Sequence, residues 1–596
     1  MRFRGSSRGL LLVAFSAVAL AGCGEAALHG NGPKRPKNKT AKATPNPFPT
    51  RDTLDKLARM PMQPQVTRNI APAADWKVDA SGADVAPPIE ARFAQVATKA
   101  GAAITYSKEL RCAARELGRF QLEHDASPDE RLKRFIIAAC GLTTPSIATG
   151  EQKGDAPKEI TDETIVLQWQ SKLTIPEEYR GGGVGIWMGR KGKRVVIFTT
   201  ATRSQTDVVV SPSDTVGQIF VRGTAPAGSE MVLGLVNQGE HGVAHCEPDT
   251  TSPLPLPLFA LRCPMAEGDK TAWVEVASRA QGHVLLRSFG LALARRDPTA
   301  IPQYAGPPRE PRPVTTAPEL RAAVLEGVNR ARASGKLAPV TMAPTQTSTN
   351  ERLAPHFFQA ALTSDQQKGD VVGLGLLAGW DVQGTIRNGN LFAALLSGTK
   401  DASSWLDYAL EMPMGRYTML EPGARQIAIG VPPPGEVGGL GAVVTTYELF
   451  GGPDHRADAA RVFDRMARLR TSRGLQQPVA IQGIKALGVQ ATLVNAGRTD
   501  AEDALNEVLL AERDRTHRSV RGWVVSTNDL DAVPFPPEML AAGPLNVGVE
   551  VTHHRPEGAA WGSYVVFLVM QVTGAPQNGV QSPQIQAVGE QATQAF

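Results

Sequence analysis

The sequence predicts a multidomain α+β protein in which a small helical domain, an immunoglobulin-like β-sandwich and two related layered domains follow one another. Three observations support this fold class. Apolar residues recur three and four positions apart in the first part of the chain, which indicates helices. Short β-branched and aromatic runs separated by turn residues follow, and these indicate strands. Two similar series of segments then occupy the second half, which indicates a duplication.

Length and composition limit the class of protein. At 596 residues the chain is too long for one hydrophobic core, because domains usually have about 100 to 200 residues. The composition, 42% apolar and 20% charged, is that of an ordinary globular protein. The net charge of +5 is small for this length, so charge gives no reason to expect a nucleic-acid partner. The 45 prolines and 58 glycines indicate many turns and linkers.

Residues 1–23 have the pattern of a lipoprotein signal peptide. Arginines precede an apolar run from Leu10 to Leu20, which is too short to span a membrane comfortably. The sequence "LAGC" that follows resembles a bacterial lipobox, and this resemblance implies that Cys23 becomes the lipidated first residue of the mature protein. The alternative is an ordinary signal peptide with a chance cysteine at this position.

A lipid anchor such as palmitate on Cys23 would hold the protein at a membrane of the bacterial cell envelope, since each buried methylene contributes about 0.8 kcal/mol. Gly24 follows the cysteine instead of aspartate, and the usual Gram-negative sorting pattern then favours the outer membrane. Residues 24–50 have few large apolar side chains and many Lys, Pro, Asn and Thr. We therefore expect a flexible tether between the membrane and the first domain.

The other four cysteines fall in two close pairs along the sequence. Export would place them in an oxidising compartment, and we predict the disulfides Cys112–Cys140 and Cys246–Cys263 among three connectivities. Closing each loop would contribute roughly 3 kcal/mol in the chain-entropy model. The alternative in the second region is a metal site made of His241, His245, Cys246 and Cys263. No Cys-x-x-Cys supports this alternative, and the disulfides already account for the thiols.

Residues 51–150 are predicted to form a mainly helical domain. The segment "ASPDERLKRF" has the signals of a helix start, with Ser127 as the cap and Pro128 at the first helical position. Gly141 is suited to closing this helix. A disulfide between two of the helices would staple the small domain together.

Residues 160–297 are predicted to form the β-sandwich. A series of short runs with a period of two, broken by turn residues, favours two antiparallel sheets in an immunoglobulin-like arrangement. Such a module has too many unrelated uses to imply a function. Residues 298–317 are rich in proline and are predicted to be an extended linker to the next domain.

A helical motif occurs twice in the second half of the chain. The segment "VLEGVNRARAS" begins at Val324, and "VFDRMARLRTS" begins 138 residues later at Val462. In this register Arg332 aligns with Arg470, and apolar residues fall in matching places. Each segment predicts an amphipathic helix whose last turn carries arginine, a residue that complements the helix macrodipole.

The correspondence extends beyond these helices to two strands and the connection between them. The aligned pairs are Trp405 with Trp523, Ala424 with Pro544 and Gly441 with Gly562. Helices followed by a closing hairpin, repeated once, imply two compact domains at residues 318–452 and 455–575. Residues 576–596 are expected to form a disordered tail.

The first copy resembles the CAP superfamily of SCP-like extracellular domains. Bacterial members open with a helix that reads roughly "NxxRxxxGLxPL", later carry "SPGHRxNLLxPxxxxIGVGV", and close with an aromatic strand, which "YELFG" matches here. The residues that match these two motifs, the first to within one residue of spacing, are Asn329, Arg332, Gly335, Leu337, Pro339, Pro413, Arg416, Leu420, Pro422, Ile427, Gly430 and Val431. The resemblance implies an α/β/α-layered fold for this copy, and the second, divergent copy inherits the assignment through the repeat.

The family's cleft gathers two histidines and acidic residues, a group that can hold a divalent cation or exchange protons. Only His356, in "ERLAPHFFQAAL", has a clear counterpart here. Gly415 replaces the histidine of the "GHR" triplet, and Asn388 and Asn390 are the nearest candidates for the family's glutamate. His356 is therefore the candidate catalytic residue, with a structural or surface histidine as the alternative. No metal ligand set and no cofactor is predicted.

The remaining motifs indicate no familiar enzyme class. In the second copy His517 comes late, among arginines, and His553 and His554 are expected on a solvated loop. The segment Ser397–Lys400 reads "SGTK", which fits the Ser-x-x-Lys spacing of some acyl-serine enzymes but lacks their other motifs. No His-Glu-x-x-His and no phosphate-binding glycine loop is present. Whether the protein is an enzyme stays open, with a non-catalytic role favoured.

We therefore predict a lipid-anchored cell-envelope protein whose degenerate CAP-like domains act in binding, adhesion or envelope structure without catalysis. Its partners would be a membrane, through the lipid, and an envelope protein or glycan. The alternative is a CAP-type hydrolase that acts on peptide or cell-wall material through His356. An adhesive or carbohydrate-binding role for the β-sandwich is a third hypothesis.

Overall fold

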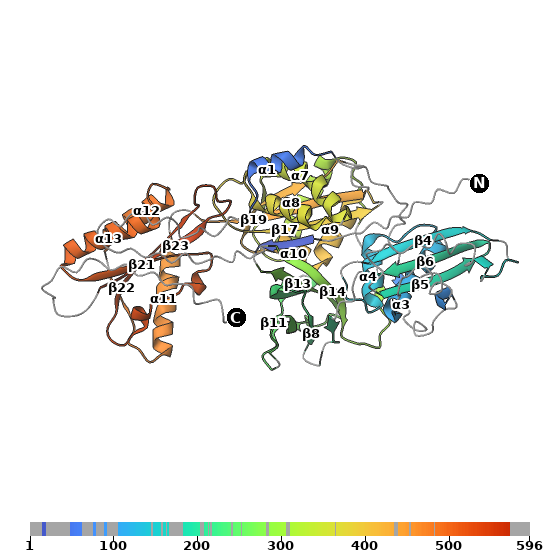
Figure 1. Cartoon of the computed structure of the whole chain (residues 1–596), viewed down its shortest axis with the longest axis horizontal. Coiled ribbons are helices and arrows are strands. Elements are labelled where there is room, and N and C mark those ends of the chain that lie inside the picture. Colours follow the sequence, from blue (N-terminus) through green and yellow to red (C-terminus); the bar gives the residue numbers. More distant parts are fainter. Residues whose placement is uncertain are drawn as a thin grey trace. The chain divides into compact units, whose positions relative to one another are not determined.

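Over the residues that it describes, the computed structural model contains helices and six sheets, arranged as several α+β modules (Figure 1). The residues that it describes are 15–19, 48–61, 75–78, 89–91, 105–144, 147–156, 159–162, 164–165, 183–202, 208–212, 214, 217–239, 242–251, 253–281, 285–304, 310–363, 365–397, 399–433, 439–451, 455–481 and 483–571. The predicted lipidation site Cys23, nearly all of the tether and the tail lie outside these ranges. No helix within them is both long and apolar enough to cross a membrane.

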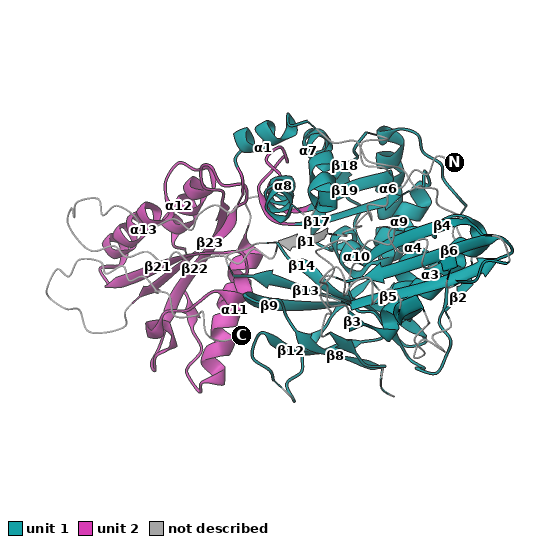
Figure 2. Ribbon diagram, turned by 45° about the vertical axis from the view of Figure 1, so that its right-hand side comes forward, with its two compact units in different colours: residues 1–19, 50–377, 390–446 teal, residues 20–49, 378–389, 447–596 magenta. Residues whose placement is uncertain are grey.

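The chain divides into two compact units (Figure 2). The first consists of residues 1–19, 50–377 and 390–446, and the second of residues 20–49, 378–389 and 447–596. The second unit therefore contains the second repeat together with residues 378–389 and 447–452, which the sequence alone assigns to the first repeat.

The N-terminal module is a layer of helices on a sheet. Helix α3 packs along β5 and β6 of a four-stranded sheet with the order β3–β5–β6–β4, and α4 packs on α3. The bounds are α3 Lys108–His124, α4 Glu130–Ala139, β3 Thr105–Tyr106, β4 Ala148–Asp155, β5 Gly183–Lys191 and β6 Arg194–Ala201. Helix α3 approaches β5 so closely that a Cβ atom on Gly185 would lie 2.1 Å from the carbonyl carbon of Leu110.

This module differs from the expected division at residues 150–160. Strands β5 and β6, which were expected in the β-sandwich, bury the apolar face of α3 instead, so the region predicted as mainly helical is an α/β layer. The predicted cap of α4 is also displaced by two positions: Asp129 is the cap, and its carboxylate accepts the Leu132 N–H at 2.8 Å. The predicted disulfide between Cys112 on α3 and Cys140 after α4 is confirmed.

Two four-stranded antiparallel sheets follow and share one hydrophobic core. Their strand orders are β10–β9–β13–β14 and β11–β12–β8–β7. The bounds are β7 Val209–Val210, β8 Gln218–Thr224, β9 Ser229–Asn237, β10 Val243–His245, β11 Glu247–Pro248, β12 Leu258–Pro264, β13 Thr271–Ala280 and β14 Arg287–Arg295. This is the expected β-sandwich over a shorter range, and its predicted disulfide Cys246–Cys263 is confirmed.

The proline-rich segment after the β-sandwich is packed against the N-terminal module. Strand β15 (Gln303–Tyr304) pairs with β2 (Trp76–Lys77). The Tyr304 side chain is 3% exposed, and its ring lies 5.4 Å from that of Phe135 on α4. Part of the predicted linker is therefore fixed by strand pairing and burial.

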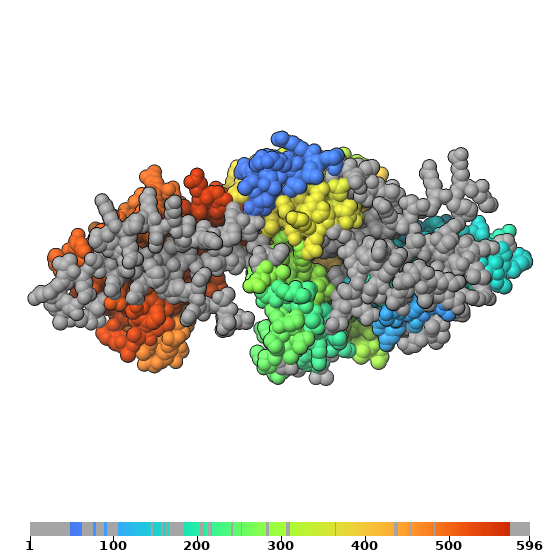
Figure 3. Space-filling model, in the orientation of Figure 1, coloured from blue at the N-terminus to red at the C-terminus, as the bar shows by residue number. Residues whose placement is uncertain are grey.

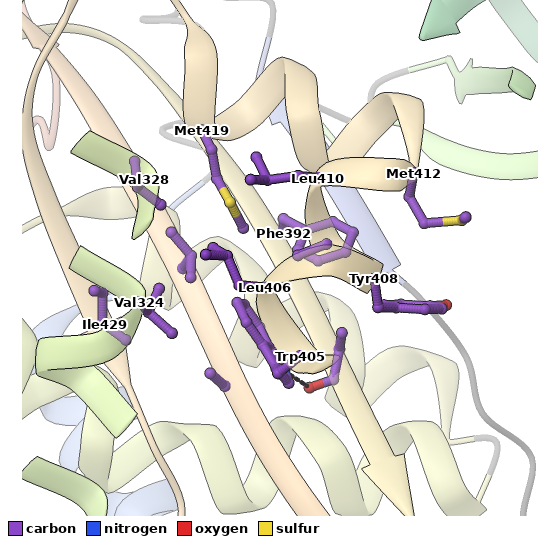
Figure 4. Packing of buried hydrophobic residues seen from close by; sticks show 14 of the residues in the cluster. Val324, Val328, Phe392, Trp405, Leu406, Tyr408, Leu410, Met412, Met419 and Ile429 are labelled. Atoms are coloured by element: carbon purple, nitrogen blue, oxygen red, sulfur yellow. Dashed lines mark hydrogen bonds between the residues drawn. The ribbon is translucent and has the colours of Figure 1, made fainter. Parts of the chain in front are cut away.

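The first repeat has three layers. Its sheet has the order β1–β17–β19–β18–β16, where β1 is Phe15–Ala19 and β16 is parallel to β18. Helices α6, α9 and α10 cover one face, and α7 covers the other with α8 beside it. The bounds are α6 Ala317–Ser334, β16 Thr341–Met342, α7 Pro344–Thr363, α8 Gln366–Ala378, β17 Ile386–Ser397, α9 Ala402–Glu411, α10 Pro413–Leu420, β18 Ala424–Gly430 and β19 Gly439–Leu449. Trp405 of α9 lies at the centre of one face, where its indole N–H donates to the carbonyl of Ala394 at 3.0 Å (Figure 4).

The four strands of the second repeat follow the order β21–β23–β22–β20, which corresponds to β17–β19–β18–β16 of the first. Strand β20 is again parallel to its neighbour β22. Helix α11 and the turns η4 and η5 cover one face, and α12 and α13 cover the other. The bounds are α11 Arg456–Ser472, β20 Val479–Ala480, α12 Lys485–Asn495, α13 Ala501–Thr516, β21 Val520–Thr527, η4 Leu530–Ala532, η5 Pro537–Leu540, β22 Asn546–His554 and β23 Ser563–Gln571. The alignment of Trp405 with Trp523 is wrong, because Trp523 lies in strand β21 and Trp405 in helix α9.

The aligned arginines of α6 and α11 make the same contacts in both repeats. Arg332 and Arg470 are both 0% exposed. The Nε atom of Arg332 donates to the carbonyl of Ala338 and that of Arg470 to the carbonyl of Gln476, each at 2.7 Å. Their Nη atoms donate to the carbonyls of Met419, Glu421 and Ala424 in the first repeat, and of Met539, Ala541 and Gly543 in the second. Each guanidinium therefore joins the end of its own helix to the segment that follows α10 in the first repeat and η5 in the second.

Candidate functional site

His356, the predicted catalytic residue, lies on α7 beneath another helix. The side chain is 2% exposed. Helix α1 (Arg51–Ala58) packs on α7, where Arg352 donates to the carboxylate of Asp55 at 2.9 Å. Figure 3 shows α1 in blue against the yellow surface of the first repeat. His356 is therefore covered and does not line an open cleft.

The surroundings of His356 cover its ring and favour its neutral form. Burial, followed by the positive charge of Lys368, lowers the pKa of this histidine. The backbone of Ala58 hydrogen-bonds the ring, and Nδ1 has no partner among the atoms described. Within the described ranges no three His, Cys, Asp or Glu side chains come together in a group that could hold a metal. The neutral ring could accept a proton, but its covered position keeps it from an open cleft.

The internal repeat supports a structural role for His356. In the register of 138 residues that aligns Arg332 with Arg470, the counterpart of His356 is Val494 on α12. Val494 is 1% exposed and belongs to the core of the second repeat. The position is thus a core position in both copies, and the first copy fills it with histidine.

A groove in the first unit is the stronger candidate for a binding site. It has a volume of about 710 Å³ and lies where the end of α6, helix α10 and the β9–β10 turn meet. The side chains that characterise it are His245, Lys336, Leu337, Arg416, Tyr417 and Glu421. The groove has two cationic side chains, Lys336 and Arg416, and one carboxylate, Glu421, so it favours an anionic ligand. We call it the Lys336 groove.

The backbone at Lys336 is held in a conformation that favours glycine. Its φ is 57°, in the left-handed region, directly after α6 ends. The aligned residue of the second repeat is Gly474, with φ of 70°. A non-glycine residue pays about 1 to 2 kcal/mol for this conformation, so the second repeat has the residue that stability prefers. The first repeat keeps an exposed lysine at the groove instead.

Lys336→Gly should therefore raise the stability of the first repeat by up to about 1 kcal/mol, because the strain is removed while no buried contact is lost. Differential scanning calorimetry of the full chain measures the change in its thermal stability. The matched variant is Gly474→Lys, which should lower the stability of the second repeat by a similar amount. Equal stability of Lys336→Gly and the parent would contradict the strain argument.

The other wall of the groove is fixed by α10 and the β-sandwich. Arg416 donates from Nε to the carbonyl of Leu410 at 2.8 Å and from Nη1 to the carbonyl of Gly239. The ring of Tyr417 meets that of His245 edge to face, with centroids 5.4 Å apart. These contacts give the groove a cationic edge and an aromatic wall.

Other residues singled out in the sequence do not assemble into a site. Ser397 is 8% exposed at the end of β17, whereas Lys400 is exposed. Both thiols of the alternative metal site are in a disulfide, and His241 lies outside the described ranges. The two disulfides indicate an oxidising compartment outside the cytoplasm.

The sequence interpretation missed a histidine pair in the second unit. His455 directly precedes α11, and its Nε2 lies 2.8 Å from Nδ1 of His553. His553 was expected on a solvated loop, but it belongs to the end of strand β22 and stacks on Phe450. The spacing of His455 and Asp458, three residues apart at a helix start, was the available signal.

The chain matches no protein-family model and no curated protein. The resemblance of the first repeat to the CAP superfamily therefore stays a prediction from its sequence motifs.

Proposed function

We propose that this chain is a lipid-anchored binding protein of the bacterial cell envelope and that the Lys336 groove holds an anionic envelope polymer. The groove carries the proposal: its volume of about 710 Å³ is in the usual range of ligand sites, roughly 300 to 1,000 Å³. Lys336 and Arg416 supply positive charge and Tyr417 supplies a flat apolar surface for a sugar ring. Attachment through Cys23 would keep the groove within reach of such a polymer.

Degenerate CAP-like domains form part of this proposal. The three-layer arrangement, present in both repeats with the same strand order, supports it. The hydrolase alternative needs His356 to act as a base or ligand, and its covered position under α1 argues against that role. Binding through the β-sandwich alone is the third possibility, and the experiment below separates it from the groove.

The test uses the mature chain with Cys23→Ser, which removes the lipid, and purified peptidoglycan sacculi as the anionic polymer. Sacculi should co-sediment the protein, and Lys336→Glu should weaken this binding at least tenfold, because it reverses one of two cations in the groove. Higher salt should weaken the binding of the parent protein, since the attraction is electrostatic. His356→Ala should bind as the parent does.

The matched control is Lys485→Glu, which makes the same charge change on the exposed start of α12. This variant should bind sacculi as the parent does. Equal weakening by both lysine variants, or no effect of Lys336→Glu, would overturn the groove as the site. Release of soluble fragments by the parent but not by His356→Ala would establish the hydrolase in its place.

A further inference from the structure

A line of polar contacts in the second unit joins the start of α11 to the end of β22. The Oδ2 atom of Asp458 lies 2.7 Å from Nδ1 of His455, and Nε2 of His455 lies 2.8 Å from Nδ1 of His553. His455 is 5% exposed. Since a carboxylate only accepts, Nδ1 of His455 carries a hydrogen. The two imidazoles therefore meet through their remaining facing nitrogens.

The contact between the imidazoles has room for one hydrogen. At 2.8 Å one nitrogen donates and the other accepts, and this holds as long as the pair carries no more than one positive charge. When both rings are charged, all four nitrogens carry hydrogen and two N–H groups face each other. The hydrogen bond then becomes a repulsive contact.

The pair supports an aromatic stack that includes the end of β19. The ring of Phe450 stacks on His553 with centroids 4.6 Å apart and planes inclined by 6°. Tyr564 of β23 meets Phe450 edge to face at 4.8 Å and accepts a hydrogen bond from Arg387 of β17 at 2.9 Å. The Phe450 N–H donates to the carbonyl of Thr385 at 3.0 Å. Within this unit, the stack attaches the ends of β17 and β19 to the second repeat.

Among the described carboxylates near the histidine pair, Glu448 and Asp531 pair with arginines, and Asp458 contacts an imidazole. The described titratable and charged groups around it are Arg387 and Glu448 from β17 and β19, Asp458 and Arg461 from α11, Asp531 from η4, His554 from β22 and Tyr564 from β23. Arg387 pairs with Glu448, and Arg461 pairs with Asp531. Asp458 is the carboxylate that contacts an imidazole, and it balances one positive charge on the pair.

We propose that the His455–His553 pair is a proton-operated clasp. With at most one positive charge it holds Phe450 and the end of β19 on the second repeat, and a second charge in acidic surroundings opens it. This regulation is separate from the Lys336 groove and does not depend on ligand binding there.

The titration of His553 supports the clasp and gives its direction. Burial, followed by the positive charges of His455 and His554, lowers the pKa of His553 to about 4. In an unfolded chain this pKa is about 6.5. Between these two values the unfolded chain binds more protons than the folded chain. The clasp therefore contributes fully to stability above pH 6.5 or so, and the contribution falls as the pH falls toward 4.

Hydrogen–deuterium exchange of the full chain at about pH 7 and pH 4, corrected for the intrinsic pH dependence, tests the clasp. In the parent, amides at residues 447–451 and 550–554 should lose protection at least tenfold at the lower pH. The strands β13 and β14 of the β-sandwich should keep theirs. His553→Gln should retain protection at pH 4, because an amide can hydrogen-bond His455 without titrating.

The proposal fails if His553→Gln loses protection as the parent does, or if the parent keeps full protection at pH 4. Because the glutamine variant could fold poorly, a second measurement uses the unsubstituted chain. Exchange of the imidazole C2 hydrogens, read by mass spectrometry, gives the pKa of each histidine. A clasp requires a pKa of His553 far below 6.5, and a value within about half a unit of 6.5 would overturn it.

Discussion

Arg470→Met should destabilise the second repeat by at least about 3 kcal/mol, the largest effect that we expect from a single side-chain truncation. The guanidinium is 0% exposed and donates to the carbonyls of Gln476, Met539, Ala541 and Gly543. Methionine fills much of the volume but supplies no donor. Hydrogen bonds from a charged group contribute about 1.5 to 3 kcal/mol each, and carbonyls left without a partner add a desolvation cost.

Because the chain has several domains, a local measurement is needed for this variant. Native-state amide exchange along β22 and β23 should be roughly a hundredfold faster or more, as about 3 kcal/mol implies. The matched control is Arg468→Met, two residues earlier on the same helix, where the side chain is exposed. This control should change exchange by less than about twofold.

The repeat supplies a second copy of the same experiment. Arg332→Met should loosen the first repeat in the same way, and Arg330→Met should not, because Arg330 is exposed and its ion pair is with Glu326 on the same helix. Lysine at either buried position should restore only part of the stability, since one ammonium cannot reproduce the planar fork of donors. Equal exchange in Arg470→Met and Arg468→Met would show that the four carbonyl contacts add little.

Gly185→Ala should have the second largest effect and should disrupt the N-terminal module. A Cβ atom at this position would lie 2.1 Å from the carbonyl carbon and 2.2 Å from the carbonyl oxygen of Leu110, which are backbone atoms of α3 and cannot rotate away. Helix α3 would have to move off β5 and β6, and we expect a loss of about 3 kcal/mol. The result bears directly on the assignment of these strands to α3 instead of the β-sandwich.

The two disulfides give this variant an internal reference. In Gly185→Ala the Cys112–Cys140 bond, which joins α3 to the end of α4, should be reduced faster by dithiothreitol, as followed by alkylation and mass spectrometry. The Cys246–Cys263 bond of the β-sandwich should react at its parental rate. The control variant is Gly488→Ala on α12, where an added Cβ meets nothing within 4 Å. An unchanged rate for Cys112–Cys140 would contradict the tight packing of α3 on β5.

Local patterns were sufficient for many elements of the fold. The period of the apolar residues predicted α3, the strands of the β-sandwich and the helix pair α6 and α11. Proximity along the chain predicted both disulfides, since each closes a short loop. The 138-residue register led to two layered domains, and the shared strand order agrees with it.

Long-range partners were beyond the same patterns. The segment "GVGIWMG" does not specify whether its strand packs on the preceding helix or on the strands that follow. In the structure it packs on α3, because both surfaces are apolar and fit closely at Gly185. The tryptophan alignment failed for a related reason: the second repeat replaces α9 and α10 by short turns and buries an indole from a strand instead. Similar composition at similar spacing does not fix which element carries a side chain.

The sequence by itself determined the duplication, the cysteine pairs and the residue types available for chemistry. The tertiary structure decided what those residues do. Burial under α1 turned His356 from a catalytic candidate into a core residue, while folding brought His455 and His553, 98 residues apart, to within hydrogen-bonding distance. The doubled arginine shows both contributions: its repetition is visible in the sequence, but only the folded turns place four carbonyl groups around each guanidinium. The physical reason is that protonation, burial and hydrogen bonding depend on neighbours in space, which spacing along a chain does not specify.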